Sequence, residues 1–464
     1  MNQKKLITLF QSLTAKDLRN LKKFVRSPYH NTREDVILLF DLLRSSPLEE
    51  LNEERLFSAL FPQKVFDKKE LAYVLNYLMK VIEDYFAVQY LEANQEEREF
   101  AIAKEALARQ QKNIFFRKVE KASKLLSVGG INTIESHQLK YELEMILCDQ
   151  QMNEERGASL NLKQPSERLE SIVIASILRQ ACSLLTHENI SKTSYDYELL
   201  HHILPYLESP EKTHLVNQPV IALYYHSYKT LKEDDINHFQ ELKQMLIAFR
   251  ASLSKRDLKN FYIISINFSI KQLNSGNGDY VREAFNLYQK ALEDDVLLDH
   301  GVLSQFHYKN IAALGLGLKA YDWVEQFLIK YREKLKTQYQ ALNFNYNFAK
   351  LQYEKGEYEA ALKLLQAVKY DESLPNLTSR ILLMKIFYEL DEREVLASYL
   401  NSFEGMVRRQ RKLGYHKNSY LNLISFMRRM LHLNPYDNLA RQKLRTAIEN
   451  KNPLPEKKWL LTKL

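Results

Sequence analysis

Residues 341–369, ALNFNYNFAKLQYEKGEYEAALKLLQAVK, decide the fold. Phe344, Phe348 and Leu351 recur at the spacing that places side chains on one face of a helix. Gly356 follows, and glycine readily adopts the left-handed conformation that ends many helices. A second apolar stripe begins at Tyr358 and also has helical spacing. Two helices with so short a link pack antiparallel, and the stretch therefore predicts a helical hairpin.

The second half of this hairpin resembles a tetratricopeptide repeat. In that family a glycine is followed two residues later by an aromatic residue and then by an alanine, which here are Gly356, Tyr358 and Ala361. Ala349 stands where the first helix of the repeat has a small residue, whereas Gln352 occupies the usual aromatic position. The resemblance implies degenerate repeats. The alternative is a generic helical hairpin in an ordinary α-helical domain.

Similar hairpins recur about every forty residues in the second half of the chain. First helices are predicted to begin near Asn217, Arg256, His300, Thr337, Asn376 and Tyr415, and second helices near Asp235, Asp279, Tyr321, Glu357, Glu392 and Tyr436. Such units cannot bury their apolar faces alone and must stack. We therefore predict an all-α fold, an α-α superhelix in the form of a tetratricopeptide-like solenoid of antiparallel helix hairpins, with an N-terminal helical module.

Three parts are predicted along the 464 residues. Residues 1–95 form the N-terminal helical module, residues 96–215 form helical hairpins that join it to the repeats, and residues 216–464 form degenerate repeats with a C-terminal cap. Capping-box patterns open three helices of the first part, at Thr14-x-x-Asp17, Thr32-x-x-Asp35 and Asp67-x-x-Glu70. In the second part, one polar helix is predicted around residues 96–126.

Taken whole, the order of a basic N-terminal module, degenerate repeats and a tail containing Trp459 resembles an uncharacterised family of bacterial helical-repeat proteins. This resemblance covers the full chain and brings no known activity with it. The residues themselves point the same way, because no P-loop, nucleophile elbow or H-E-x-x-H motif occurs. Gly315-Leu-Gly317 lacks the third glycine of a dinucleotide site and indicates close helix packing instead. We expect no catalysis, no metal and no cofactor.

The compartment is predicted from two features of the chain. Cys148 and Cys182 lie inside helical patterns and indicate buried thiols in a reducing compartment. No apolar run approaches the roughly 20 residues needed to span a bilayer, so no membrane partner is expected. Lysines before a short apolar segment resemble a signal peptide, but the spacing of Leu6, Leu9 and Phe10 favours an amphipathic first helix. A cytoplasmic protein is predicted.

Positive charge gathers at both ends of the chain, whose net charge is +8. Residues 1–33 hold eight basic residues and one acidic residue, and residues 405–464 hold fourteen and three. Basic side chains on successive hairpins would release counterions from a phosphate backbone. The residues predicted to bind a polyanion are Arg408, Arg409, Arg411, Lys412, Arg428 and Arg429. The alternatives are a solvated end repeat or a contact with the acidic middle of the chain.

The tetratricopeptide register implies a partner-binding surface on the concave face of the solenoid. The residues that it places there are Phe306, Lys309, Asn343, Tyr346, Lys350 and Tyr353. Amides, lysines and aromatic rings suit an extended peptide or a helix. We therefore expect a non-catalytic protein–protein interaction scaffold. The alternative is a nucleic-acid-associated protein that uses its basic N- and C-terminal regions.

Overall fold

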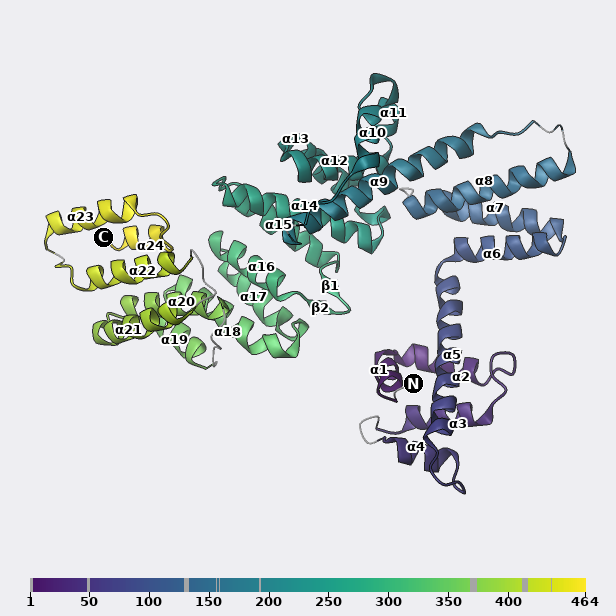
Figure 1. The fold of residues 1–464 in the computed structure, drawn as a ribbon, viewed down its shortest axis with the longest axis horizontal. Coiled ribbons are helices and arrows are strands. Elements are labelled where there is room, and N and C mark those ends of the chain that lie inside the picture. The colour runs from purple at the N-terminus through teal and green to yellow at the C-terminus, as the bar shows by residue number, and fades with distance from the viewer. Residues whose placement is uncertain are drawn as a thin grey trace. The chain divides into compact units, whose positions relative to one another are not determined.

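A computed structural model describes residues 3–47, 51–128, 133–155, 157, 159–191, 193–367, 374–410, 416–434 and 436–464 of the chain. These residues are almost entirely helical, which confirms the all-α prediction (Figure 1). Two compact units are formed. Unit 1 consists of Met1–Ile177 and Leu199–Ile221, and unit 2 consists of Leu178–Glu198 and Ala222–Leu464. The three predicted parts remain a prediction.

Unit 1 holds the first helices of the chain. These are α1 (Gln3–Ser12), α2 (Ala15–Val25), α3 (Glu34–Ser45), α4 (Glu53–Leu60), α5 (Lys68–Ala93), α6 (Gln95–Ala108), α7 (Lys112–Val128), α8 (Ile134–Glu154), the start of α9 (Lys163–Ser191), α10 (Glu198–Leu207), the 3₁₀ helix η2 (Pro210–Lys212), α11 (Thr213–Val216) and the start of α12 (Pro219–Glu233). Helices α1 to α5 share one apolar core, in which Leu21, Leu39 and Leu78 are completely buried.

Two of the three predicted capping boxes are used as caps. Thr14 accepts a hydrogen bond from the backbone N–H of Asp17 at 3.1 Å, and the Asp17 carboxylate accepts one from the N–H of Thr14 at 2.9 Å. Asp67 likewise caps α5. The prediction at Thr32 was wrong, because α3 has Arg33 at its N-cap position without a side-chain cap. The Arg33 guanidinium instead forms a bidentate contact with the Asp35 carboxylate, with Nε 3.0 Å from Oδ1 and Nη2 2.5 Å from Oδ2.

The single helix predicted around residues 96–126 was also wrong. The chain turns between α6 and α7 at Gln110, whose φ of 58° lies in the left-handed region. The turn lets Phe100 and Ala103 of α6 pack into one apolar cluster with Phe115 of α7. Burial of both apolar faces compensates for a conformation that is unfavourable for glutamine.

Unit 2 is a series of helical hairpins. Its further elements are α13 (Ile236–Phe249), η3 (Arg250–Ser252), α14 (Lys255–Asn274), α15 (Tyr280–Glu293), strands β1 (Leu298–Asp299) and β2 (Val302–Leu303), α16 (Gln305–Gly317), α17 (Tyr321–Tyr331), η4 (Arg332–Lys334), α18 (Thr337–Lys355), α19 (Tyr358–Gln366), α20 (Leu374–Glu389), α21 (Arg393–Arg409), α22 (His416–Leu431), α23 (Asn438–Asn450) and α24 (Lys457–Thr462). From α13 to α22 each helix packs against the next.

The helices of unit 2 begin close to the predicted positions, except α16. That helix begins at Gln305 rather than near His300, because β1 and β2 form an antiparallel hairpin in front of it. His300 and Gly301 make the turn, with φ values of 50° and 80°. First helices of successive hairpins also touch, since α16 packs against α18 and α18 against α20. Each hairpin therefore covers part of the next, as a helical-repeat fold requires.

The hairpin of α18 and α19 has the predicted design. Gly356 follows α18 in the left-handed conformation, with φ 86°. Ala349 and Ala361 are both completely buried, and they belong to one cluster with Leu365, Leu382 and other residues of α18 to α20. Small side chains at this position allow the two helices to approach closely.

Helix α9 departs from the expectation that no apolar run is long enough to span a bilayer. By length and composition alone, its segment Lys163–Glu188 qualifies, and it is the one helix that does so among the residues that the structure describes. Core helices of soluble proteins have the same composition. Ile174, Leu178 and Cys182 of α9 are buried, whereas Leu169 and Val173 are exposed, so the helix is only partly covered by the rest of the fold.

Gly315 marks the closest helix approach that the structure identifies at a glycine. A Cβ atom there would lie 2.4 Å from Cγ2 of Val324 and 3.0 Å from the Phe285 ring, and Val324 is fully buried. At Gly317, two residues further on, the nearest atom would lie at an ordinary 3.7 Å. The prediction that these glycines serve helix packing is confirmed for Gly315.

We predict that Gly315→Ala lowers the free energy of unfolding by about 1–3 kcal/mol, because the methyl group overpacks a filled core. Gly317→Ala is the matched control and should leave the melting temperature unchanged or slightly raised, since alanine favours a helix. Thermal unfolding followed by circular dichroism compares the two variants. Equal melting temperatures would show that α16 and α17 are not packed as described.

Candidate partner-binding site

The predicted partner-binding surface carries a segment of the same chain. Residues 456–464, here called the C-terminal segment, contain α24 and contact helix α20, where they share the Glu389 carboxylate with Tyr353 of α18. Tyr346, Lys350 and Tyr353 share one face of α18, because they are four and three residues apart. On α20, a second set with helical spacing consists of Lys385, Tyr388 and Glu389. These six residues are called the first-helix face below.

The Glu389 carboxylate is the centre of the contact. It accepts hydrogen bonds from the Tyr353 hydroxyl at 3.0 Å, from Nε1 of Trp459 at 3.1 Å and from Nζ of Lys463 at 2.7 Å. Only 10% of its side chain is exposed. A carboxylate buried to this degree is stable when its oxygens are hydrogen-bonded, and here two of the three donors belong to the C-terminal segment.

A positive charge, that of Lys385, lies about one helical turn before Glu389 on α20. Nζ of Lys385 is 2.9 Å from the Glu456 carboxylate, and only 12% of the lysine side chain is exposed. The same ammonium group lies 4.8 Å from the centre of the Tyr353 ring and 5.3 Å from that of Trp459, which are cation–π distances. The acidic end of the segment therefore meets a lysine, and its basic end meets an acid.

Aromatic rings fill the space between these charges. The rings of Trp459 and Tyr388 meet edge to face, with centroids 5.4 Å apart. Such contacts stabilise more than the buried area alone. Glu456 and Lys463 are the residues that flank α24 (Lys457–Thr462), and Trp459 lies within it; all three contact α20. The segment thus presents an acid, an indole and a base in a fixed order.

Burial shifts the titration of the first-helix face. It raises the pKa of Tyr353, and the neighbouring Glu389 charge raises it further. Burial also raises the pKa of Tyr346. The pKa of Lys350 is lowered by burial, while the charges of Glu354 and Glu456 oppose that shift. These three side chains are therefore partly removed from water. An ion pair formed beside them is stronger than the same pair in bulk water.

The other side of α24 is held by the helices of the last hairpin. Leu460 is completely buried in a cluster with Leu444 of α23 and other residues. Arg441 donates to the backbone oxygen of Leu464, and Arg445 donates to that of Leu461 at 3.3 Å. Cationic groups at the carbonyl end of a helix are favourable. Two arginines of the basic C-terminal region therefore fix α24 in place.

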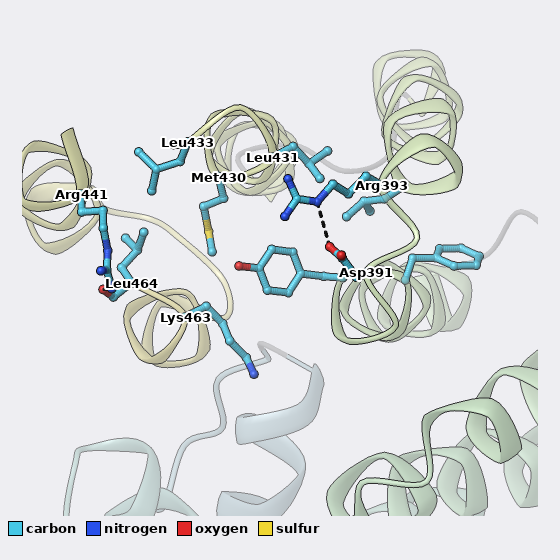
Figure 2. A pocket seen from close by; sticks show the side chains of 11 residues that line it. Asp391, Arg393, Met430, Leu431, Leu433, Arg441, Lys463 and Leu464 are labelled. Atoms are coloured by element: carbon cyan, nitrogen blue, oxygen red, sulfur yellow. Dashed lines mark hydrogen bonds and ion pairs between the residues drawn. The ribbon is translucent and has the colours of Figure 1, made fainter. Parts of the chain in front are cut away.

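A cavity of about 300 Å³ lies next to Lys463 and Leu464 (Figure 2). Apolar side chains form much of its wall, namely Phe387, Leu396, Met430, Leu431, Leu433 and Leu464. Arg393 also lines it, with Nε hydrogen-bonded to Asp391 at 2.8 Å. In Figure 2 the ammonium group of Lys463 points away from the other labelled residues, so the cavity is not filled by that side chain.

The six predicted partner-binding residues lie in different environments. Tyr346, Lys350 and Tyr353 belong to the first-helix face, as described above. Asn343 is completely buried, and its Nδ2 donates to the backbone oxygen of Tyr339 at 2.9 Å. Because Asn343 is buried and bonded within α18, its side chain is not available to contact a partner.

Phe306 and Lys309 lie on α16. The Phe306 side chain is 69% exposed, and burial lowers the pKa of Lys309. Among the described residues, no contact joins either of them to the C-terminal segment. Sequence reasoning missed Lys385, Tyr388 and Glu389, although their i, i+3, i+4 spacing places them on one face of α20.

Arg408 and Arg428, from the predicted polyanion-binding set, share one acid. Nη2 of Arg408 lies 2.6 Å from the Glu404 carboxylate, and Nη1 of Arg428 lies 2.5 Å from it. Arg428 also donates to Oδ1 of Asn401 at 2.8 Å. The carboxylate offsets one of the two positive charges, which weakens this pair as a site for a phosphate backbone.

The other members of that set are more dispersed. Arg409 is exposed on α21, and the guanidinium of Arg429 lies 5.2 Å from the centre of the Phe426 ring on α22. Arg411 and Lys412 lie outside the residues that the structure describes. Both basic-patch binding and partner binding therefore remain predictions.

Comparison with protein-family models, with curated proteins and with solved structures finds no match to this chain. Within the described residues, no group of three or more histidine, cysteine, aspartate or glutamate side chains is arranged to hold a metal ion.

We predict that Glu389→Gln releases the C-terminal segment. The glutamine amide loses the ion pair with Lys463, and its NH₂ group faces the N–H and O–H donors that the carboxylate accepts from. The loss is expected to be about 1.5–3 kcal/mol, typical of a hydrogen bond to a charged group. A Trp323→Phe background leaves Trp459 as the only tryptophan, so its fluorescence reports the docking directly.

Release should shift the Trp459 emission to longer wavelength and increase its quenching by acrylamide. Glu394→Gln, an exposed acid on α21, is the matched control and should change neither signal. An unchanged spectrum in Glu389→Gln would mean that the carboxylate does not hold the segment.

Proposed function

We propose that this protein is a non-catalytic protein–protein interaction scaffold, and that its first-helix face binds a short helical segment of a partner protein. The observation that carries the proposal is the seating of Glu456, Trp459 and Lys463 on that face. A surface that accommodates a helix of its own chain through side chains alone has the features of a peptide-binding surface. Recognition of a helix through side chains at i, i+3 and i+7 is a recurrent mode of protein binding.

The arrangement of charge supports a specific binding direction. Lys385 and Glu389 are one helical turn apart on α20, so the face has a cationic end and an anionic end. A helix laid on the face in reverse would bring like charges together, and such contacts suppress wrong partners. Aromatic rings between the charges provide large contact areas with few rotatable bonds.

The C-terminal segment then acts as an occupant that a partner must displace. Its own contacts with Lys385, Tyr388 and Glu389 cover this part of the face in the absence of a partner, which limits non-specific association. When a partner binds, its helix replaces the C-terminal segment on the first-helix face.

Affinity purification of the tagged full-length protein from its own cells, with and without nuclease, tests this function. We predict that wild type retains the same protein partner after nuclease treatment. Lys385→Glu should reduce that partner at least about tenfold, because reversing one charge of a mostly buried pair costs about 2 kcal/mol or more. Lys443→Glu, the same charge change at an exposed site on α23, is the control and should retain the partner.

The alternative function predicts the opposite pattern. If the associated material disappears with nuclease, and if charge reversal at Arg408 and Arg409 removes it while Lys385→Glu does not, the protein binds nucleic acid through its basic C-terminal region. That result would reject the scaffold proposal.

A further inference from the structure

Helix α2 presents one basic face to solvent. The side chains of this face recur at i, i+3, i+7 and i+10 and are those of Lys16, Arg19, Lys23 and Arg26. All four are exposed, whereas the apolar side chains on the opposite side of the helix belong to the core of unit 1. The four positions extend over about 15 Å of the helix axis. They are called the α2 basic face below.

Three of these cations have no acid paired with them. Among the residues that the structure describes, no ion pair joins Lys16, Arg19 or Lys23 to a carboxylate, whereas Arg26 pairs with Asp41 at 2.5 Å. The three unpaired cations can therefore meet a phosphate backbone without first giving up an ion pair, and they would release its counterions. The arginines that share Glu404 at the other end of the chain differ in this respect.

A fixed turn carries an aromatic ring at the end of the α2 basic face. Tyr29 lies three residues after Arg26, and its side chain is 92% exposed. The turn is held by Asn31, which is only 3% exposed. Nδ2 of Asn31 donates to the backbone oxygen of Val25 at 2.9 Å and to that of Arg33 at 3.2 Å. The backbone that bears the Tyr29 ring is therefore anchored at both ends of the turn.

A series of ring contacts supports Tyr29 from below. The His30 ring stacks on that of Phe24, with centroids 3.8 Å apart, and Phe24 meets the buried Tyr85 of α5 edge to face. Tyr29 in turn meets His30 edge to face, with centroids 5.1 Å apart. An exposed ring that is already held in this way loses little conformational freedom when a ligand stacks on it.

We propose that the α2 basic face and Tyr29 together bind single-stranded nucleic acid, with phosphates along the basic side chains and an unpaired base stacked on the Tyr29 ring. Cations that follow a backbone and aromatic rings that stack on bases are the two components of sequence-tolerant single-strand binding. Bases inside a duplex already stack on each other, so a duplex would meet the charge alone. This surface lies in unit 1 and does not depend on the first-helix face.

An anionic membrane would also attract these charges, but α2 lacks the other feature that such a ligand requires. Helices that lie on a bilayer present large apolar side chains beside their basic ones. In α2, Leu21 and Val25 are completely buried, and Phe24 stacks with His30. The exposed side chains of the helix are those of Ala15 and the basic residues. The face therefore fits a phosphate backbone better than a bilayer.

Fluorescence anisotropy of a labelled oligo(dT) of about 15 nucleotides, titrated with the full-length chain at several salt concentrations, tests the charge. The triple variant Lys16→Gln, Arg19→Gln, Lys23→Gln removes the three unpaired cations. Each phosphate contact to a single strand contributes about 0.7 to the slope of log K against log salt concentration. We predict that the slope of the triple variant is smaller than that of wild type by about 2.

A second triple variant controls for net charge. Lys232→Gln, Lys334→Gln and Lys363→Gln remove three cations at exposed positions scattered over unit 2. This control should keep the wild-type slope. Melting temperatures equal to that of wild type, followed by circular dichroism, show that both triple variants are folded.

Tyr29 variants test the stacking. Tyr29→Ala should weaken binding of oligo(dT) by roughly 5- to 100-fold, the effect of losing one base–aromatic stack, with the salt slope unchanged. Tyr29→Phe keeps the ring and should bind like wild type. Binding of a duplex of the same length should not respond to Tyr29→Ala, because its bases are not free to stack on the ring.

Different outcomes reject different parts of the inference. If wild type does not bind oligo(dT), or if both triple variants lose the same slope, the α2 basic face is not a nucleic-acid site. Equal effects of Tyr29→Ala on oligo(dT) and on the duplex reject base stacking. If wild type binds only vesicles that contain phosphatidylserine, and the α2 triple variant loses them, the ligand is a membrane. None of these results affects the scaffold proposal, whose test depends on Lys385.

Discussion

A helical hairpin buries an apolar face only when another hairpin covers it, and this constraint governs unit 2. Each helix from α13 to α22 packs against the next, and the apolar faces of α22 and α23 must be covered in turn. The chain meets this requirement by folding back. Leu460 of α24 enters the core of the last helices, and the same short helix places Trp459 on the first-helix face. One segment thus closes the stack and occupies the candidate site.

The sequence predicted the parts of this arrangement that depend on local rules. Apolar spacing and turn residues located the hairpins, and Gly356 ends α18 in the left-handed conformation that its position implied. Gly315 lies where two helices approach closely, because its lack of a side chain leaves room for Val324 and Phe285. Where a local rule failed, tertiary packing prevailed: a glutamine at position 110 adopts a conformation that favours glycine, because the turn buries both α6 and α7.

The contacts that define the site could not be read from spacing. Glu389 and Lys463 are far apart along the chain, and neither stands in a recognisable motif. Charge counting was also incomplete, since it added Arg408 and Arg428 to a basic patch without the Glu404 carboxylate that lies between them. Asp294, an acid at the unfavourable end of α15, likewise has its explanation in distant partners, because it accepts a hydrogen bond from Tyr262 and pairs with Arg250.

The position of the C-terminal segment also determines when the first-helix face can be covered during synthesis. Ribosomes make α18 and α20 before residues 456–464, and domains form as the chain emerges. The aromatic first-helix face is therefore uncovered for as long as the remaining helices take to be made and folded. Arg441 and Arg445 of α23 hold α24 from behind, so both α20 and α23 contribute to the place where the covering helix docks. A nascent chain that stops before residue 456 therefore leaves the first-helix face without this cover.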